Sequence, residues 1–317
     1  MGASLHTLAR SVAPALAERG TPPAQATATV CVASTLGIVI PPSLVLLLLG
    51  HAMLQAHTQA MNLSQAATRI VNTQDLMRAA LIPGAIVLAM ALGWTAWRTR
   101  HGARLSMPTL PPRARTTAGV TAAAIAGLLS GVALGGLYAI EAAAAGGILL
   151  LAYAAGSGQL KRGVMRHVLT DAMPLTGLPM ALLVAATTFS LVLHAFAIDA
   201  LIARGLDSLA GRPTVLLACV LIGLIACSFV LDAFEMVFLV IPLVMPPVLV
   251  AVPDPAWVAT LALLVLQMGF LLPPFGYAVL MSRSTIASNA SLPALARALR
   301  PYLIMQAALV LAVLAWP

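Results

Sequence analysis

Few residues in this chain can do chemistry, and the clearest candidates are two proline pairs inside apolar runs. One pair stands in Ile40-Pro41-Pro42-Ser43 and the other in Leu272-Pro273-Pro274-Phe275-Gly276. A proline removes a backbone donor and clashes with the preceding turn, so two in succession end a helix. Inside a membrane such a break persists only where protein or a polar cavity covers it. Paired breaks, one in each half of a chain, are typical of the substrate and ion site of an inverted-repeat secondary transporter.

A second candidate is the pair of carboxylates Asp232 and Glu235, which stand inside an apolar run. Residues three apart share a helix face, and carboxylates in an apolar run are costly unless paired or solvated. One interpretation makes them a polar lining of a transport pathway, or a proton or sodium relay. The other is structural, with Asp232 as a helix N-cap and Glu235 completing a capping box. The residues alone leave both interpretations open.

Other polar side chains carry weaker signals. Gln267 precedes the second break, where it either contacts substrate or bonds a neighbouring helix. Glu141 precedes an alanine-rich run, so it either has a function or favours a helix N-terminus. Cys31, Cys219 and Cys227 form no CxxC or Cys/His cluster, and we expect them to be packing residues.

Composition indicates an all-α polytopic membrane protein that lies in a lipid bilayer. Of 317 residues, 61% are hydrophobic and 8% are charged, with mean hydropathy +1.00. Several runs exceed the roughly 18 to 20 apolar residues that cross a bilayer. The formal charge of +8 would suggest nucleic acid for a soluble domain. Here the arginines fall in short links between apolar runs, as the positive-inside rule describes, so we expect no nucleic-acid partner and a cytoplasmic link at Arg98–Arg115.

The apolar pattern predicts about eight or nine spans plus two broken hairpins. An amphipathic segment at residues 1–20 comes first and lacks the pattern of a signal peptide. The first hairpin is expected at about 27–57 and the second at about 255–283. The other expected spans lie near residues 76–97, 117–134, 139–155, 173–197, 213–230, from 232 onward, and 302–316.

The strings around both breaks resemble a known family. Ser34-Thr35-Leu36-Gly37-Ile38-Val39-Ile40-Pro41-Pro42-Ser43 resembles the Gly-Thr-Leu-Gly-x-x-Ile-Pro-Pro-Ser signature of the large, DctM-like permease subunit of tripartite ATP-independent periplasmic (TRAP) transporters. Leu231-Asp232-Ala233-Phe234-Glu235 and Gln267-Met268-Gly269-Phe270-Leu271-Leu272-Pro273-Pro274-Phe275-Gly276 are similar to strings of its mannitol and chloroaromatic-compound branch. The resemblance covers nearly the whole chain, residues 1–317, as a single transmembrane permease domain.

The resemblance begins partway into the family's pattern. Relatives are longer at the N-terminus by about three spans, on the order of 100 residues. The N-terminal spans of the family are therefore expected to be absent here. Met1 is then either a misplaced start or the start of a truncated copy.

The resemblance implies a sodium-coupled importer of organic acids in the bacterial inner membrane. A periplasmic binding protein delivers substrate, a small membrane subunit completes the scaffold, and the large subunit moves its transport domain as an elevator. No cofactor is expected besides sodium as the coupling ion.

The resemblance also implies that the two hairpin tips hold substrate and ion. The residues concerned are Ser34, Thr35, Gly37, Pro41, Pro42, Ser43, Asp232, Glu235, Gln267, Pro273, Pro274 and Gly276. Sodium in particular would bind at Thr35, Gly37, Pro273 and Gly276. Broken helices supply carbonyl oxygens for the ion at one end and amides for a carboxylate at the other.

Departures from the family pattern bear on the coupling ion. Ile140 and Val265 stand where relatives carry hydroxyl and amide side chains, and Met268, Gly269 and Leu272 replace positions that are often polar. Backbone carbonyls still permit sodium binding, but a weakened or absent sodium site, and proton coupling in its place, are alternatives. A truncated, non-transporting remnant is a further alternative. An enzyme is not expected, because the chain has no Gly-x-Ser-x-Gly, no His-Glu-x-x-His and no obvious second catalytic aspartate beside Asp232.

Overall fold

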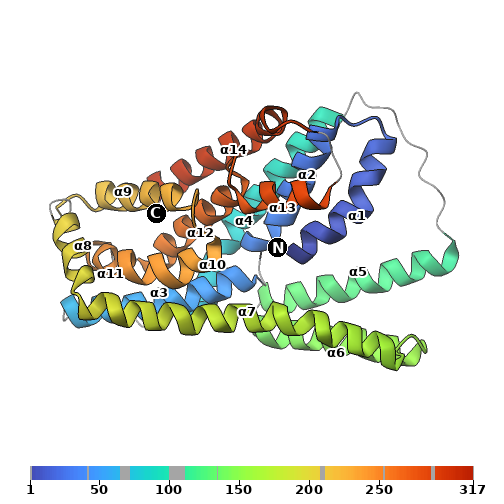
Figure 1. Cartoon of the computed structure of the whole chain (residues 1–317), viewed down its shortest axis with the longest axis horizontal. Coiled ribbons are helices and arrows are strands. Elements are labelled where there is room, and N and C mark those ends of the chain that lie inside the picture. The colour runs from blue at the N-terminus through green and yellow to red at the C-terminus, as the bar shows by residue number, and fades with distance from the viewer. Residues whose placement is uncertain are drawn as a thin grey trace.

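The protein is a bundle of helices, seen here in a computed structural model (Figure 1). The structure describes residues 2–40, 43–64, 72–99, 111–133, 135–207, 211–252, 254–286 and 290–316, and within them it contains helices and connections but no strand. The helices are α1 (Gly2–Glu18), α2 (Pro23–Val39), α3 (Leu44–Ser64), α4 (Thr73–Thr99), α5 (Pro112–Ala133), α6 (Ala139–Gly156), α7 (Arg162–Ala195), α8 (Ile198–Asp207), α9 (Pro213–Cys227), α10 (Ala233–Glu235), the π-helix η1 (Met236–Val240), α11 (Ile241–Ala251), α12 (Pro255–Leu271), α13 (Tyr277–Thr285) and α14 (Leu292–Ala315).

Helix α12 occupies the centre of the bundle. Its residues from Val258 to Leu271 are all buried, and α2, α3, α4, α9, α13 and α14 all contact it. A helix that is apolar on every side is stable only when every side is covered. Pro255 at the first turn and the Asp254 carboxylate, which accepts the Ala256 and Trp257 amides at 3.0 and 3.1 Å, begin this helix.

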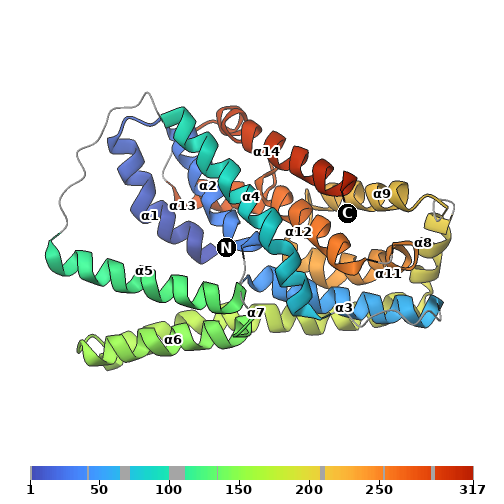
Figure 2. The same cartoon turned by 180° about the vertical axis from the view of Figure 1, so that it is seen from behind.

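The first proline pair interrupts a helix whose two halves follow one another along α4. At the start of α4, Thr73 lies against Gly50 of α3. Gly84, in the middle of α4, lies against the carbonyl of Val39 at the end of α2, and the last turn of α4 lines a cavity with the first turns of α2. Helix α4 therefore runs antiparallel to α2 and α3 in succession, and Figures 1 and 2 show the two halves leading away from the break in different directions. The re-entrant hairpin expected at about 27–57 stays a prediction.

At the second interruption, α12 and α13 contact each other and both contact α2, and each helix also has neighbours of its own. Helix α12 lies antiparallel to α14, since Trp257 Nε1 donates to the Val313 carbonyl at 2.7 Å and Gln306 bonds Gln267. After the break, α13 contacts α1 and α2. Cys31 Sγ of α2 lies 3.5 Å from the Ala278 carbonyl of α13, to which it donates.

Helices α5 and α6 form an arm that projects from the bundle with the first half of α7 (Figures 1 and 2). The helices α5 and α6 cover the expected spans near residues 117–134 and 139–155, and they pack against each other. The arm carries large exposed apolar side chains, including Val120, Ile148 and Leu178. Such a continuous apolar surface requires lipid or another protein to cover it.

Five helical segments are long and apolar enough to cross a membrane within the described residues: Leu44–Asn62, Thr73–Arg98, Arg162–Leu193, Ala233–Ala251 and Leu292–Ala315. Four shorter apolar helices accompany them, at Pro23–Val39, Ile140–Gly156, Pro213–Cys227 and Pro255–Leu271. The prediction of an all-α, multi-pass membrane protein is confirmed. Two spans begin earlier than expected, α7 at Arg162 and α14 at Leu292, because helices there extend through basic residues that resemble links.

Candidate functional site

Two helix interruptions meet beside α12. One is the connection Leu272–Gly276 between α12 and α13, and the other is Ser228–Asp232, which separates α9 from α10. Ser228 touches the last turn of α12 at Gly269, because a Cβ atom on Gly269 would lie 2.5 Å from the Ser228 Cβ and 2.8 Å from its hydroxyl. The absence of a side chain at Gly269 thus permits the Ser228–Asp232 connection to approach α12 just before the second connection begins.

The second proline connection is tightly folded around its glycine. The Gly276 amide donates to the Leu272 carbonyl at 2.8 Å, and the Leu272 amide donates to the Gly269 carbonyl at 3.2 Å. A Cβ on Gly276 would lie 2.5 Å from the Phe270 carbonyl oxygen. Only glycine fits there, because backbone atoms cannot move aside as a flexible side chain can. The Phe270 and Tyr277 rings meet edge to face across the connection, with centroids 6.1 Å apart.

Asp232 and Glu235 form the capping box that the spacing allowed. The Asp232 carboxylate accepts the Ala233 amide at 2.6 Å, and the Glu235 carboxylate accepts the Asp232 amide at 3.0 Å. Orphan amides at the start of a helix are satisfied in this way. The structure therefore contains the capping arrangement, which was the structural interpretation of the pair. Each carboxylate keeps further lone pairs for another partner.

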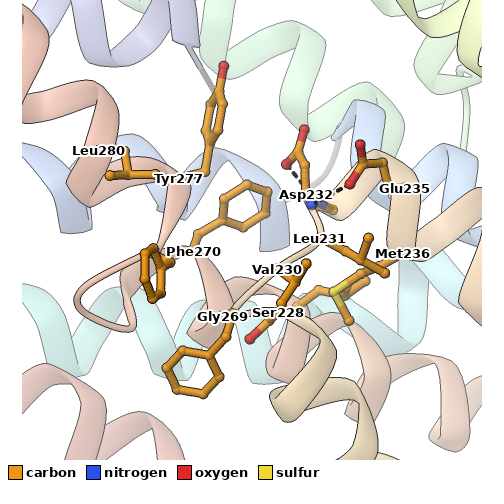
Figure 3. A pocket seen from close by; sticks show the side chains of 14 residues that line it. Ser228, Val230, Leu231, Asp232, Glu235, Met236, Gly269, Phe270, Tyr277 and Leu280 are labelled. Carbon is orange, nitrogen blue, oxygen red and sulfur yellow. Dashed lines mark hydrogen bonds between the residues drawn. The ribbon is translucent and has the colours of Figure 1, made fainter.

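A cavity of about 220 Å³ lies where the two interruptions meet. Both carboxylates line it, together with Ser228, Gly269 and Tyr277. In Figure 3, Asp232 and Glu235 project side by side from the start of α10, with Tyr277 on the facing helix. The lining combines carboxyl and hydroxyl oxygens with apolar rings, and oxygen atoms are the ligands that a hard cation prefers. Two carboxyl groups suit a cation or a proton better than an anion.

The segment after the capping box is a π-helix, η1, at Met236–Val240. Single π turns inside helices are frequent at functional sites because they leave the regular hydrogen-bond pattern. This feature could not be read from the sequence. The π-helix is a second departure from regular helix geometry, after the Ser228–Asp232 interruption, and it begins directly after Glu235.

At the first interruption, the predicted hydroxyls bond their own helix or the next one. Ser34 Oγ donates to the Cys31 carbonyl at 2.8 Å, and Thr35 Oγ1 donates to the Val32 carbonyl at 2.9 Å. Both side chains are buried, and both keep an acceptor lone pair. Ser43 Oγ accepts the Leu46 amide at 3.3 Å and so caps α3.

The remaining residues of the first interruption differ in their surroundings. Gly37 is exposed, and a Cβ there would meet nothing within 4 Å. Pro41 and Pro42 lie outside the described residues. The cavity at the second interruption is lined by none of Ser34, Thr35 or Gly37, so the structure does not bring the two predicted groups into one site.

Gln267 serves helix packing. Its side-chain oxygen accepts the Gln306 amide at 2.9 Å, and that amide also donates to the Leu264 carbonyl at 3.2 Å. Both glutamine side chains are buried. The hydrogen bond to a neighbouring helix, one of the two alternatives for this residue, is the arrangement found. At the second break, Gly276 is buried, Pro273 is half-buried and Pro274 is exposed.

Three residues near the two proline pairs were not predicted from the sequence to matter for the site. Ser228 and Tyr277 line the cavity, and Gly84 allows α4 to approach the Val39 carbonyl. Glycine next to proline in Leu81-Ile82-Pro83-Gly84 was a signal for Gly84, since such a glycine often marks close backbone approach. Ser228 and Tyr277 had no local signal.

Comparison with known families gives a match over almost the entire chain. The model of the tripartite ATP-independent periplasmic transporter, DctM component, matches residues 2–317. The chain belongs to the DctM family. A search among curated proteins finds no match. DctM proteins are the large permease subunits of TRAP transporters, and they work with a small membrane subunit and a periplasmic binding protein.

Membership in the DctM family confirms the resemblance that the two proline strings carry. It also agrees with the apolar helices of a multi-pass membrane protein and with transport as the family's activity. In this DctM chain, the cavity at the second interruption brings two helix interruptions together with the ionisable side chains of Asp232 and Glu235.

Proposed function

We propose that this DctM-family chain is the permease subunit of a TRAP system that imports an organic acid across the bacterial inner membrane, driven by a sodium gradient. A periplasmic binding protein delivers the acid, and a small membrane subunit completes the scaffold. Residues 1–317 act as one permease domain of the mannitol and chloroaromatic-compound branch. The observation that carries the proposal is the cavity at the meeting of Ser228–Asp232 and Leu272–Gly276.

Sodium is the ion that we assign to this cavity. Na⁺ takes hard oxygen ligands, and two carboxylates with a serine hydroxyl supply them beside a helix interruption. Intramembrane carboxylates are costly, so they are retained mainly where they serve a pathway. Asp232 and Glu235 fit this role because capping uses one oxygen of each and leaves others for an ion. Pro273 and Gly276 contribute backbone oxygens at the same break in this proposal.

A second ion position at the first interruption is also part of the proposal. Thr35 and Gly37 lie within the last turns of α2, where carbonyl groups lose their helical partners. The buried Thr35 hydroxyl keeps its acceptor side available. Movement of the bundle as an elevator would carry both positions across the bilayer together.

Proton coupling is the alternative that a specific observation favours. Val265 and Met268, both buried on α12, offer no side-chain oxygen where relatives have polar groups. A carboxylate pair beside a tyrosine can pass a proton without the full shell that sodium needs. Replacement of sodium by a proton changes the driving ion but keeps the same cavity.

The test is uptake of a candidate organic acid in proteoliposomes that hold this chain with its small subunit and binding protein. We expect uptake to rise when a sodium gradient is imposed and to be unaffected by a proton gradient alone. Uptake driven by protons and indifferent to sodium would overturn the sodium assignment. Absence of uptake under both gradients would favour a non-transporting remnant.

A pair of matched variants links the cavity to coupling. Asp232→Asn keeps a capping oxygen but removes the charge, so we expect at least a tenfold loss of sodium-dependent uptake with folding retained. Asp254→Asn makes the same change at the exposed cap of α12, outside the cavity, and should leave uptake near wild type. Equal uptake by both variants would contradict a role for Asp232 in coupling.

A further inference from the structure

A separate cavity of about 330 Å³ opens at the other end of the bundle, where four elements converge. It is enclosed by the connection between α1 and α2, the first turns of α2, the last turns of α4 and the first turns of α14. It shares no lining residue with the cavity at the second interruption. The transport proposal therefore leaves this cavity unexplained.

Two arginines line this cavity without an acidic partner. Arg98 stands at the end of α4 and Arg297 in the first turns of α14. Arg297 Nε donates to the carbonyl of Pro293 at 3.3 Å. Among the described residues, no carboxylate lies within ion-pair distance of either guanidinium, and no carboxylate lines the cavity. Two guanidinium groups at one cavity favour an anion, and their planar donors match a phosphate in particular.

Both arginines stand near the ends of candidate membrane spans, where we expect the lipid headgroups. Arg98 ends the span Thr73–Arg98, and Arg297 lies near the start of the span Leu292–Ala315. Trp94 lines the cavity and stands beside Trp97, with ring centroids 5.1 Å apart. Tryptophan and tyrosine gather at this depth because their rings are apolar at one end and polar at the other.

The polar groups of the cavity wall are arranged in a fixed network. The Thr95 hydroxyl lies 2.7 Å from the Ala91 carbonyl, to which it donates, and 3.0 Å from the Tyr302 hydroxyl. Because Thr95 has one hydroxyl hydrogen, Tyr302 donates to Thr95. Tyr302 is buried, so this bond fixes α4 to α14 at the cavity. The two arginines are thereby presented from helices held at a constant spacing.

The rest of the wall combines apolar residues, including Ala28, Ala294 and Ala298, with the polar side chains of Thr21, Gln25 and Thr29. A free inorganic anion gains nothing from the alanines, whereas a phospholipid places its phosphate at the arginines, its glycerol group beside the polar side chains and its acyl groups on the alanines. Basic pockets between membrane helices are a known kind of site for anionic lipid headgroups. We propose that this cavity binds the phosphate of an anionic phospholipid and that Arg98 and Arg297 hold it.

The experiment measures lipid binding to the full chain in nanodiscs. Native mass spectrometry compares phosphatidylcholine discs containing phosphatidylglycerol with discs of phosphatidylcholine alone. At about 1 kcal/mol for each arginine, loss of one charge should weaken phosphatidylglycerol binding about fivefold and loss of both about thirtyfold. The variants are Arg98→Gln, Arg297→Gln and the pair combined. Both side chains are exposed, so these changes should leave folding intact.

The matched control is Arg162→Gln with Arg166→Gln, two exposed arginines at the start of α7 that do not line the cavity. We expect this pair to retain wild-type binding. An equal loss in the control pair would overturn the proposal by showing a general charge effect. Inorganic phosphate is the other arm: displacement of phosphatidylglycerol by millimolar phosphate, in the discs that contain this lipid, would identify a small-anion site and would also overturn a lipid site.

Discussion

Gly269 and Ser228 stand so close that a methyl group on Gly269 would overlap the serine side chain, at 2.5 Å from its Cβ. Ser228 cannot move aside easily, since its Cβ is attached directly to the backbone and its hydroxyl donates to the Ile225 carbonyl at 2.6 Å. Gly269→Ala should therefore push α12 away from the Ser228–Asp232 connection. We expect a loss of about 1–3 kcal/mol in the free energy of unfolding, as overpacking usually costs.

Thermal unfolding in detergent measures this loss, and uptake measures its effect on the cavity. Gly223→Ala on α9 is the control, because a Cβ there meets nothing within 4 Å. That change should be neutral or stabilising, since alanine favours a helix over glycine by up to about 1 kcal/mol. A Gly269→Ala protein as stable as the control would contradict the close approach.

Gly84→Ala tests the contact between α4 and the end of α2. A Cβ at Gly84 would lie 3.1 Å from the Val39 carbonyl oxygen and 3.2 Å from its Cγ1. We expect a loss of about 1 kcal/mol, less than at Gly269, because a displacement of a few tenths of an ångström relieves the contact. Gly93→Ala on the same helix has open space around it and should not lower the melting temperature. Similar melting temperatures for the two variants would argue against the predicted packing.

The bond between Gln267 and Gln306 can be measured with a double-mutant cycle. Each glutamine is changed to leucine alone and then together, and the unfolding free energies are compared. We expect a coupling energy of about 0.6 kcal/mol, the usual size for a side-chain hydrogen bond between membrane helices. Sodium-dependent uptake by Gln267→Leu should stay within about twofold of wild type, because its amide serves α14. A loss of uptake far beyond the loss of stability would restore substrate contact as the role of Gln267.

Trp257→Phe removes the donor that joins the start of α12 to the end of α14. Trp257 Nε1 donates to the Val313 carbonyl at 2.7 Å. We expect a cost of about 1 kcal/mol, the net value of one intramolecular hydrogen bond, plus a small term for lost packing. Trp97→Phe is the control, since the Trp97 side chain is exposed and lies on α4. If both substitutions lower the melting temperature equally, the bond to Val313 does not stabilise the bundle.

Much of the fold could be predicted from local signals. Pro213 and Asp232 begin helical segments as expected, because proline suits a first turn and aspartate suits an N-cap. The extent of α7 and α14 could not be predicted. Arg166 and Arg297 precede the spans expected at 173–197 and 302–316, yet both lie inside helices, since a long charged side chain can reach the membrane surface from within a span.

The candidate site was predictable in its parts and not in its assembly. The proline pairs marked both interruptions, and the spacing of Asp232 and Glu235 allowed the capping box. The meeting of Ser228 with Gly269 depends on the packing of α9 against α12, which no local pattern encodes. The path of the chain beyond the first proline pair could not be predicted for the same reason: a proline pair ends a helix, but the surrounding helices decide where the chain goes next.

Helix α4 packs across the first interruption, since it contacts α3 near Thr73 and α2 near Gly84. Helix α4 also has an irregular position of its own beside the end of α2. Pro83, inside α4, supplies no amide to the preceding turn and stands next to the glycine that meets Val39. Bending would therefore concentrate at one depth in two adjacent helices, while the segments above and below move as rigid rods.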